Sequence, residues 1–180
     1  DGVELAELVY NPKHTNKEND TISMPNIESR TVAQKPDIVL QLTKNDLHDG
    51  MKMTYLFDAK YRIGGKDKGA DVPPDDAINQ MHRYRDAIYY SKEHEPYKAK
   101  EVIGGYILFP GRGEDEHISN RYYSKSVGTV NIGAFPLLPH ADKELEGRLL
   151  RNHLQSILID KVNTESHVDK AKPQRTLAYV

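Results

Sequence analysis

The sequence predicts an α/β domain in which a mixed central β-sheet is flanked by helices. Two short apolar runs, residues 38–42 and 54–57, are separated by a polar segment and are typical of a β-hairpin. Residues 75–91 carry apolar side chains at helical spacing, and an apolar run at residues 101–110 follows them. The order strand, helix, strand favours a right-handed crossover, so the strand at residues 101–110 is expected to pair in parallel with an earlier strand.

Length and composition predict one folded domain. The chain has 180 residues, of which 37% are hydrophobic and 29% charged, which is enough apolar material for one core. We expect the domain to span residues 1–160 and residues 161–180 to be a polar linker or extension. Because the chain begins with Asp1, we expect it to be a fragment of a larger protein.

Several classes of protein are excluded or disfavoured by residue usage. There is no cysteine, which excludes disulfides and thiolate zinc sites and is compatible with a cytoplasmic location. No apolar run approaches the length of a membrane span, and the given residues show no signal-peptide pattern, so we expect no membrane partner. The formal net charge is −2, so nucleic-acid binding requires a local cluster of basic side chains.

Three charged residues are predicted to meet at one end of the hairpin. Asp37 precedes the first strand and Asp58 follows the second, so antiparallel pairing places the two carboxylates side by side. Lys60 projects to the same side of the strand as Asp58, about 7 Å further along. Pro36 restricts the backbone ahead of Asp37 and thereby fixes its direction.

Two adjacent carboxylates need a cation between them if both are to stay ionised. Carboxylate oxygens suit Mg²⁺, which completes its coordination with water and substrate phosphate, and Mn²⁺ is the natural substitute. A lysine beside such an ion can orient or deprotonate a water molecule. The pattern therefore predicts metal-assisted hydrolysis of a phosphodiester. The sequence has no P-loop, dinucleotide fingerprint or nucleophile elbow to support another chemistry.

The chain resembles the PD-(D/E)xK nuclease superfamily at Pro36-Asp37 and at Asp58-Ala59-Lys60. It also resembles the nuclease domain of McrBC-like restriction proteins and related proteins of unassigned function, in the segments DAKYR, DDAINQMHRYRDAIYY and GGYILFPG. The resemblance extends from about residue 10 to residue 111 and implies a restriction-endonuclease-like fold. It also implies that the carbonyl of Ala59 helps to bind the metal.

The helix at residues 75–91 contributes two further candidates. Gln80 and Tyr84 match a Gln-x-x-x-Tyr pair of several branches of the superfamily, and four-residue spacing puts them on one face of the helix. The resemblance implies that they hold the Lys60 region, a metal-bound water or phosphate; otherwise Tyr84 is a core residue and Gln80 lies at its rim. The superfamily often has a third acidic ligand, for which Glu4 and Glu7 are possible substitutes.

Five basic residues are candidates for nucleic-acid binding. Residues 61–74 are rich in glycine and proline and predict a mobile loop, which is either a basic flap over nucleic acid or a solvated loop. Two arginines of the helix are the other candidates. The five residues are Arg62, Lys66, Lys68, Arg83 and Arg85.

The remaining segments complete the expected sheet and its covering. Residues 1–10 fit both a strand and a helix pattern, and the resemblance to the superfamily implies a strand. Residues 27–34 are expected to hold a short strand, and the apolar residues 130–139 are expected to pack on the sheet. Residues 141–159 predict a second helix.

The function we expect is that of a Mg²⁺-dependent endonuclease acting on DNA. The resemblance implies a restriction or phage-defence role, with a homodimer or with a recognition or motor module choosing the target. A repair or junction-resolving nuclease on the same fold stays open, as does RNA as substrate. A non-catalytic nucleic-acid-binding or assembly domain also stays open, because the third acidic ligand is not located.

Overall fold

The computed structural model describes residues 3–14, 27–29, 32–44, 52–90, 102–118, 122, 125–142 and 145–159. The predicted polar extension at residues 161–180 and the hairpin turn at residues 45–51 lie outside these ranges.

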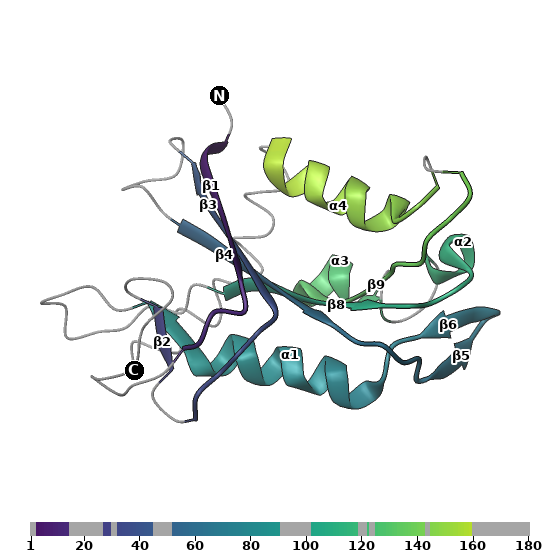
Figure 1. Ribbon diagram of the computed structural model, residues 1–180, viewed down its shortest axis with the longest axis horizontal. Coiled ribbons are helices and arrows are strands. Elements are labelled where there is room, and N and C mark those ends of the chain that lie inside the picture. Colours follow the sequence, from purple (N-terminus) through teal and green to yellow (C-terminus); the bar gives the residue numbers. More distant parts are fainter. Residues whose placement is uncertain are drawn as a thin grey trace, which may run out of the picture.

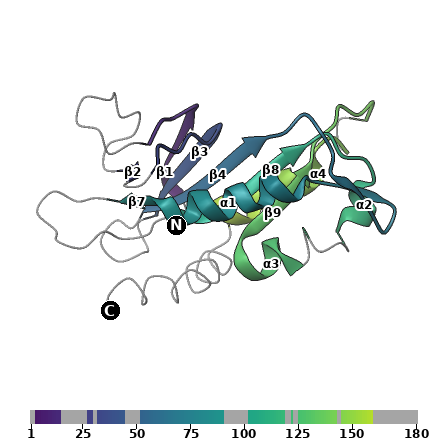
Figure 2. The same cartoon turned by 90° about the horizontal axis from the view of Figure 1, so that it is seen from below.

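The described residues form a mixed five-stranded sheet covered by a helix on each face, as predicted. The sheet has the strand order β1-β3-β4-β8-β9. Helices α1 and α4 lie on opposite sides of it (Figure 1), and Figure 2 shows α1 running along the sheet. Among the described residues, no helix is long and apolar enough to cross a membrane.

The sheet is antiparallel on one side and parallel on the other. The antiparallel half consists of β1 (Val3–Tyr10), β3 (Ile38–Lys44) and β4 (Lys52–Ala59), which confirms the predicted hairpin and the strand at the start of the chain. The parallel half adds β8 (Val102–Phe109) and β9 (Ile132–Pro136). The predicted parallel pairing is therefore present between β4 and β8.

Alternation along the strands divides the core into two clusters, one under each helix. Leu56 of β4 belongs to the cluster under α1 (Asp75–Ala87), and its neighbours Tyr55 and Phe57 belong to the cluster under α4 (Arg148–Ile159). All three side chains are buried. A charged residue in phase with Leu56 near the end of β4 must therefore face α1.

Close packing of α1 on the sheet depends on Gly105 of β8. A β-carbon at this position would lie 3.3 Å from the β-carbon of Met81, whose side chain is fully buried. The group that approaches Gly105 is therefore a side chain of α1, and a larger residue at this position would push α1 away from the sheet.

The predicted loop at residues 61–74 is instead organised around a short β-hairpin. It consists of β5 (Gly65–Asp67) and β6 (Ala70–Val72), and its turn includes Gly69 with φ +87°. Residues Ala70 and Val72 are buried. Composition predicted a loop here because three-residue strands are too short to give a period-2 pattern.

Both long helices are shorter than their apolar stripes. The helix predicted at residues 75–91 ends at Ala87, after which β7 (Ile88–Tyr90) pairs with β2 (Ile27–Ser29). The helix predicted at residues 141–159 begins at Arg148, because Gly147 has φ +60° and cannot continue a right-handed helix. Two single-turn helices, α2 (Glu114–His117) and α3 (Val127–Val130), lie in the stretch before β9.

Candidate active site

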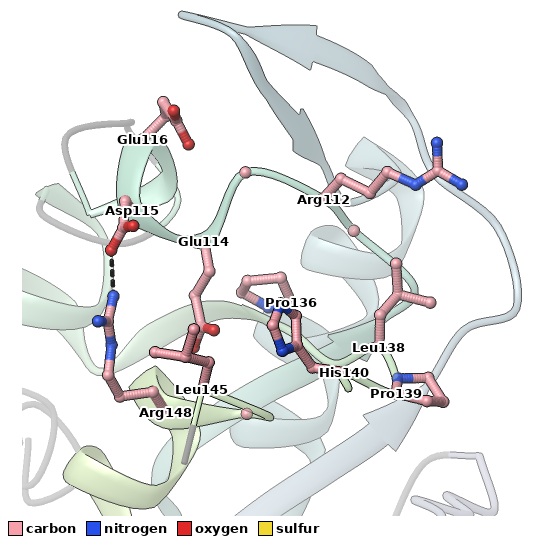
Figure 3. Close-up of a pocket in the computed structure, with 13 residues that line it drawn as sticks. Arg112, Glu114, Asp115, Glu116, Pro136, Leu138, Pro139, His140, Leu145 and Arg148 are labelled. Atoms are coloured by element: carbon pink, nitrogen blue, oxygen red, sulfur yellow. Dashed lines mark hydrogen bonds and ion pairs between the residues drawn. The ribbon is translucent and has the colours of Figure 1, made fainter. Parts of the chain in front are cut away.

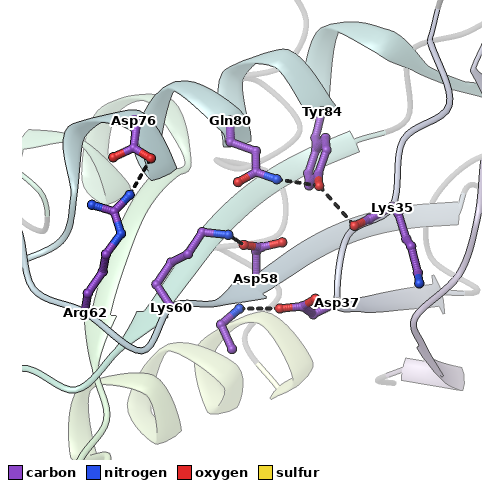
Figure 4. Close-up of polar contacts among 9 residues, drawn as sticks. Lys35, Asp37, Asp58, Lys60, Arg62, Asp76, Gln80 and Tyr84 are labelled. Carbon is purple, nitrogen blue, oxygen red and sulfur yellow. Dashed lines mark hydrogen bonds and ion pairs between the residues drawn. The ribbon is translucent and has the colours of Figure 1, made fainter.

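Asp58 and Lys60 lie at the carboxyl end of β4, on the side of the sheet that α1 covers. Asp58 is in phase with Leu56, and only 2% of its surface is exposed. The ammonium of Lys60 donates a hydrogen bond to Oδ2 of Asp58 (Figure 4). The backbone N–H of Lys60 donates to the carbonyl of Leu108 at 2.8 Å, which extends the pairing of β4 with β8 and fixes the point from which the lysine side chain leaves.

Asp37 meets this pair from the neighbouring strand. Ile38 pairs with Phe57, so the register places Asp37 opposite Asp58. Oδ2 of Asp37 accepts a hydrogen bond of 2.7 Å from the backbone N–H of Ala59. Pro36 is buried, and it holds the chain extended where β3 begins. The structure therefore brings together the two carboxylates and the lysine, as the sequence predicted.

The pKa of Asp58 shows that its negative charge is incompletely compensated. Burial raises the pKa of this carboxyl, the hydrogen bond and positive charge of Lys60 lower it, and the charge of Asp37 raises it again. The net direction is upward. One ammonium thus faces two carboxylates, and an additional cation would favour the ionised form of both.

Gln80 and Tyr84 form a short hydrogen-bonded chain on α1. The amide Nε2 of Gln80 donates to the Tyr84 hydroxyl at 2.6 Å, and this hydroxyl donates to the backbone carbonyl of Lys35 at 3.0 Å. Figure 4 shows both side chains on the face of α1 that overlooks Asp58 and Lys60. Burial and the negative charge of Asp58 raise the pKa of Tyr84, so its hydroxyl stays protonated and able to donate. The bonds of this pair connect α1 to the segment that carries Asp37, two residues after Lys35.

The five predicted basic residues are distributed over different parts of the molecule. Arg62 forms an exposed ion pair of 2.6 Å with Asp76 in the first turn of α1. Lys66 and Lys68 are exposed on the β5–β6 hairpin. Arg83 is exposed on α1, where it lines a groove together with Lys35 and the Gln80–Tyr84 pair.

Arg85 lies apart from the carboxylates and is directed to another segment of the chain. Its guanidinium donates a hydrogen bond of 2.7 Å to the carbonyl of Val130, and burial lowers its pKa. The structure therefore gives Arg85 a bond that joins α1 to the end of α3. Nucleic-acid binding by this residue stays a prediction.

The candidate third acid Glu7 does not reach the carboxylate pair. It is exposed on β1 and pairs with Gln41, four residues along β3 from Asp37 and thus roughly 13 Å away. The side chain of Glu4 lies outside the described residues. In the described part of the chain, no group of three or more acidic, histidine or cysteine side chains is arranged to hold a metal.

Sequence reasoning missed the contacts that involve backbone atoms and distant partners. The Lys35 carbonyl has no sequence signal because every residue carries a carbonyl. The Arg62–Asp76 pair spans 14 residues, and only an exposed arginine after β4 and an acidic first turn of α1 indicate it. Neither contact could be deduced without the register of the elements.

A separate cavity of about 420 Å³ lies between α2, the end of β9 and the start of α4 (Figure 3). Its acidic side chains already have partners: Asp115 pairs with Arg148, and Oε1 of Glu114 accepts a hydrogen bond of 2.6 Å from the N–H of Leu149. None of the predicted catalytic residues lines this cavity. The candidate active site is therefore the cluster at the end of the β3–β4 hairpin.

Comparison with known proteins agrees with this geometry. The family model of the PD-(D/E)XK nuclease superfamily matches residues 2–114, which is more than half of the chain. The chain belongs to the PD-(D/E)XK nuclease superfamily. No curated protein and no solved structure matches it.

Within the PD-(D/E)XK superfamily, proteins are usually nucleases and typically use divalent metals such as Mg²⁺. The matched region contains β1, β3, β4, α1 and β8, and hence every residue of the carboxylate, lysine and Gln–Tyr arrangement. The two helices α3 and α4 and strand β9 lie beyond it.

Proposed function

We propose that the protein is a Mg²⁺-dependent endonuclease that hydrolyses DNA phosphodiester bonds, with Mn²⁺ as an alternative ion. The observation that carries the proposal is the convergence of Asp37, Asp58 and Lys60 at one end of a single hairpin. Membership of a nuclease superfamily supports the same chemistry.

The donor set fits a hard divalent cation. Two carboxylates meet there, and one of them, Asp58, is deeply buried and has a raised pKa. Among the described residues, the ammonium bonded to this buried carboxylate is that of Lys60. Each carboxylate uses Oδ2 for the hydrogen bond described above, so Oδ1 of each lies outside those bonds. Asp37, Asp58 and the carbonyl of Ala59 would hold the ion. When bound, such an ion supplies Lewis-acid activation of water and stabilisation of phosphate charge.

Lys60 acts next to these carboxylates on the attacking water and the phosphate. Its side chain is 22% exposed, so the ammonium is accessible from solvent while bonded to Asp58. It orients the water by hydrogen bonding and stabilises the negative charge that develops on the phosphoryl oxygens. The bond to Asp58 holds the ammonium in position before substrate arrives.

Gln80 and Tyr84 act as positioning residues in this proposal. Their hydrogen bonds connect α1 to Lys35 and so fix the start of the strand that presents Asp37. Four exposed basic residues are proposed to contact phosphates: Arg62 after β4, Lys66 and Lys68 on the β5–β6 hairpin, and Arg83 on α1. Arg85 is proposed as a further phosphate contact. To bind DNA, its guanidinium must first give up its hydrogen bond to the carbonyl of Val130.

We further propose a restriction or phage-defence role, on the resemblance of the DAKYR and DDAINQMHRYRDAIYY segments to McrBC-like nuclease domains. Cutting both strands of a duplex requires two active sites, so a homodimer or a recognition or motor module would complete the system.

A non-catalytic nucleic-acid-binding domain is the second candidate. One observation favours it: the described residues offer two carboxylates at the site and no third acidic ligand. The intact lysine and the raised pKa of Asp58 favour the hydrolytic function instead.

The deciding experiment is cleavage of supercoiled plasmid with Mg²⁺ or Mn²⁺ by wild type, Lys60→Ala and Asp58→Asn. Arg151→Ala is the matched control, because Arg151 is exposed on α4 at the opposite face of the sheet. We expect wild type and the control to cut and the two site variants to lose at least about 100-fold in rate, as for loss of a group that stabilises a transition state. Circular dichroism verifies that all variants are folded.

Calorimetry with Mg²⁺ and Mn²⁺ separates the two candidates if the wild type does not cut. A bound ion that Asp58→Asn abolishes would support a competent site that needs a partner. Absence of any bound ion, together with absence of cleavage, would reject the nuclease proposal in favour of the binding domain.

A further inference from the structure

A groove of about 660 Å³ lies immediately beyond the carboxyl ends of the three parallel strands. Its lining comes from residues 61–63 after β4, from Pro110 and Arg112 after β8, and from Leu138 after β9. The β5–β6 hairpin supplies the remaining wall. Crevices outside the carboxyl ends of parallel strands are where open α/β sheets bind ligands. The groove begins one residue after Lys60, so it adjoins the proposed active site.

Hydrogen bonds fix the walls of this groove to each other. The N–H of Asp71 donates to the carbonyl of Arg112 at 3.0 Å, and the N–H of Arg112 donates to Oδ2 of Asp71 at 2.9 Å. The N–H of Gly64 donates to the carbonyl of Val72 at 2.7 Å. The Asp71 carboxylate is buried and is used in this connection. The hairpin is thus tied to the segment after β8, and the groove is part of the fold.

The most exposed aromatic side chain of this region stands in the groove wall. Tyr61 is 97% exposed, and Ile63, two residues later, is 43% exposed. A tyrosine ring buries a large area when it finds a partner, so a fully exposed ring next to an active site indicates a binding surface. Tyr61 directly follows Lys60, so the groove and the proposed hydrolytic centre share the segment that leaves β4.

The side chains around Tyr61 are predominantly basic. Arg62, Lys66 and Arg112 are all exposed in the lining, whereas the one acidic side chain there, Asp71, already accepts the N–H of Arg112. Arg62 is oriented by its ion pair with Asp76. Aromatic rings interleaved with cations are the arrangement by which proteins bind single-stranded nucleic acid, with bases stacked on the rings and phosphates on the cations.

We propose that this groove binds an unpaired nucleotide beside the scissile phosphate, with its base stacked on Tyr61 and its phosphates held by Lys66 and Arg112. The inference rests on the proposed nuclease function and specifies its substrate: single strands, frayed ends or flaps in preference to closed duplex. In a closed duplex both faces of each base are already stacked, so Tyr61 has no face to contact.

The test measures binding without hydrolysis. Fluorescence anisotropy in EDTA compares a labelled 20-nucleotide single strand with a closed hairpin duplex, using wild type, Tyr61→Ala and Tyr61→Phe. We expect wild type to prefer the single strand and Tyr61→Ala to lose about 5- to 100-fold in affinity for it, with no change for the duplex. Tyr61→Phe keeps the ring and retains the affinity. The matched control is Tyr10→Ala, because Tyr10 is 74% exposed on β1 and is in phase with the opposite face of the sheet.

Three results would overturn the proposal: equal affinity of wild type for single strand and duplex, no binding to either, or no effect of Tyr61→Ala. A loss caused equally by Tyr10→Ala would show a non-specific aromatic effect and would overturn it too. The binding measurement uses no metal and involves no cleavage. A negative result in it can therefore be distinguished from a negative result in the plasmid assay. The two proposals can also be separated by cleavage. If Lys60→Ala abolishes cleavage and Tyr61→Ala has no effect on any substrate, the nuclease function is supported and the stacking site is rejected.

Discussion

Asp37 accepts a hydrogen bond of 2.7 Å from the backbone N–H of Ala59, 22 residues further along the chain. This bond joins the start of β3 to the end of β4 and sets the carboxylate of Asp37 beside that of Asp58. Every substitution of Ala59 except proline keeps this backbone N–H, so the bond is best tested by changing the acceptor at position 37. Asp37 thus has two properties that can be changed independently: the hydrogen bond that it accepts and the negative charge that it carries.

Substitution of Asp37 tests these two properties separately. Asp37→Asn keeps an oxygen acceptor for the Ala59 N–H, so we expect its stability to stay within about 0.5 kcal/mol of wild type. Asp37→Ala removes the acceptor and is expected to lose about 1–2 kcal/mol in free energy of unfolding. Both variants lose the negative charge, and both should lose metal-dependent cleavage. Urea denaturation and the plasmid assay check this; cleavage retained by Asp37→Asn would show that the charge is unnecessary.

Asp58→Asn is expected to stabilise the protein while abolishing its activity. Burial raises the pKa of Asp58 above the ordinary carboxyl value of 3.8. Between that value and the higher folded-state pKa, the folded protein binds more protons than the unfolded chain, so the free energy of unfolding falls as pH rises. At pH values above this window, the loss in free energy of unfolding no longer changes with pH. The neutral amide of Asp58→Asn removes this loss of stability, so we expect the variant to be more stable than wild type at pH 7 without metal.

The measurement for Asp58→Asn is thermal unfolding of both proteins in EDTA from pH 3 upward. The melting temperatures should be closest at the acid end and diverge as pH rises through the window, with the variant higher. Asp142→Asn, an exposed position, is the control and should follow wild type. A variant less stable than wild type at neutral pH would contradict the pKa argument. Addition of Mg²⁺ should raise the melting temperature of wild type alone.

Tyr84→Phe is expected to weaken activity through position rather than chemistry. The substitution removes the hydroxyl that connects Gln80 to the carbonyl of Lys35 but keeps the buried ring. We expect a loss of about 1 kcal/mol in stability from the broken bonds and a fall in the cleavage rate because Asp37 is held less well. Urea denaturation and cleavage at saturating Mg²⁺ measure the two effects. Tyr10→Phe is the control. An unchanged cleavage rate in Tyr84→Phe would show that the hydrogen bonds from Gln80 through Tyr84 to Lys35 have no influence on the site.

Arg83 and Arg85 should differ in what they contribute. Arg85 bonds the carbonyl of Val130, so Arg85→Ala is expected to destabilise the fold by about 1–3 kcal/mol. Arg83 is exposed, and Arg83→Ala should leave stability within about 0.5 kcal/mol. If Arg83 contacts a phosphate, Arg83→Ala should lower DNA affinity. The slope of log binding constant against log salt concentration should become shallower by roughly one unit. The reverse assignment, a stable Arg85→Ala with weakened DNA binding, would place Arg85 in the interface.

Most of the sheet was predictable because its strands carry strong local patterns. The apolar runs of β3, β4 and β8 are continuous, and the stripe of α1 repeats at helical spacing, so each element could be recognised alone. The hairpin β5–β6 and the pairing of β2 with β7 could not, because three-residue strands have no periodicity and depend on partners. The start of α4 was missed because glycine also occurs inside helices, and only the structure shows that Gly147 has a positive φ.

The sequence by itself determined the fold class and the meeting of Asp37, Asp58 and Lys60, since hairpin pairing and side-chain alternation are properties of the local backbone. Tertiary structure alone decided the contacts among distant segments. The bond from Tyr84 to Lys35 spans 49 residues and the one from Arg85 to Val130 spans 45. The groove around Tyr61 likewise exists only because parallel pairing aligns the carboxyl ends of β4, β8 and β9. Such contacts arise from the packing of whole elements, which no local pattern encodes.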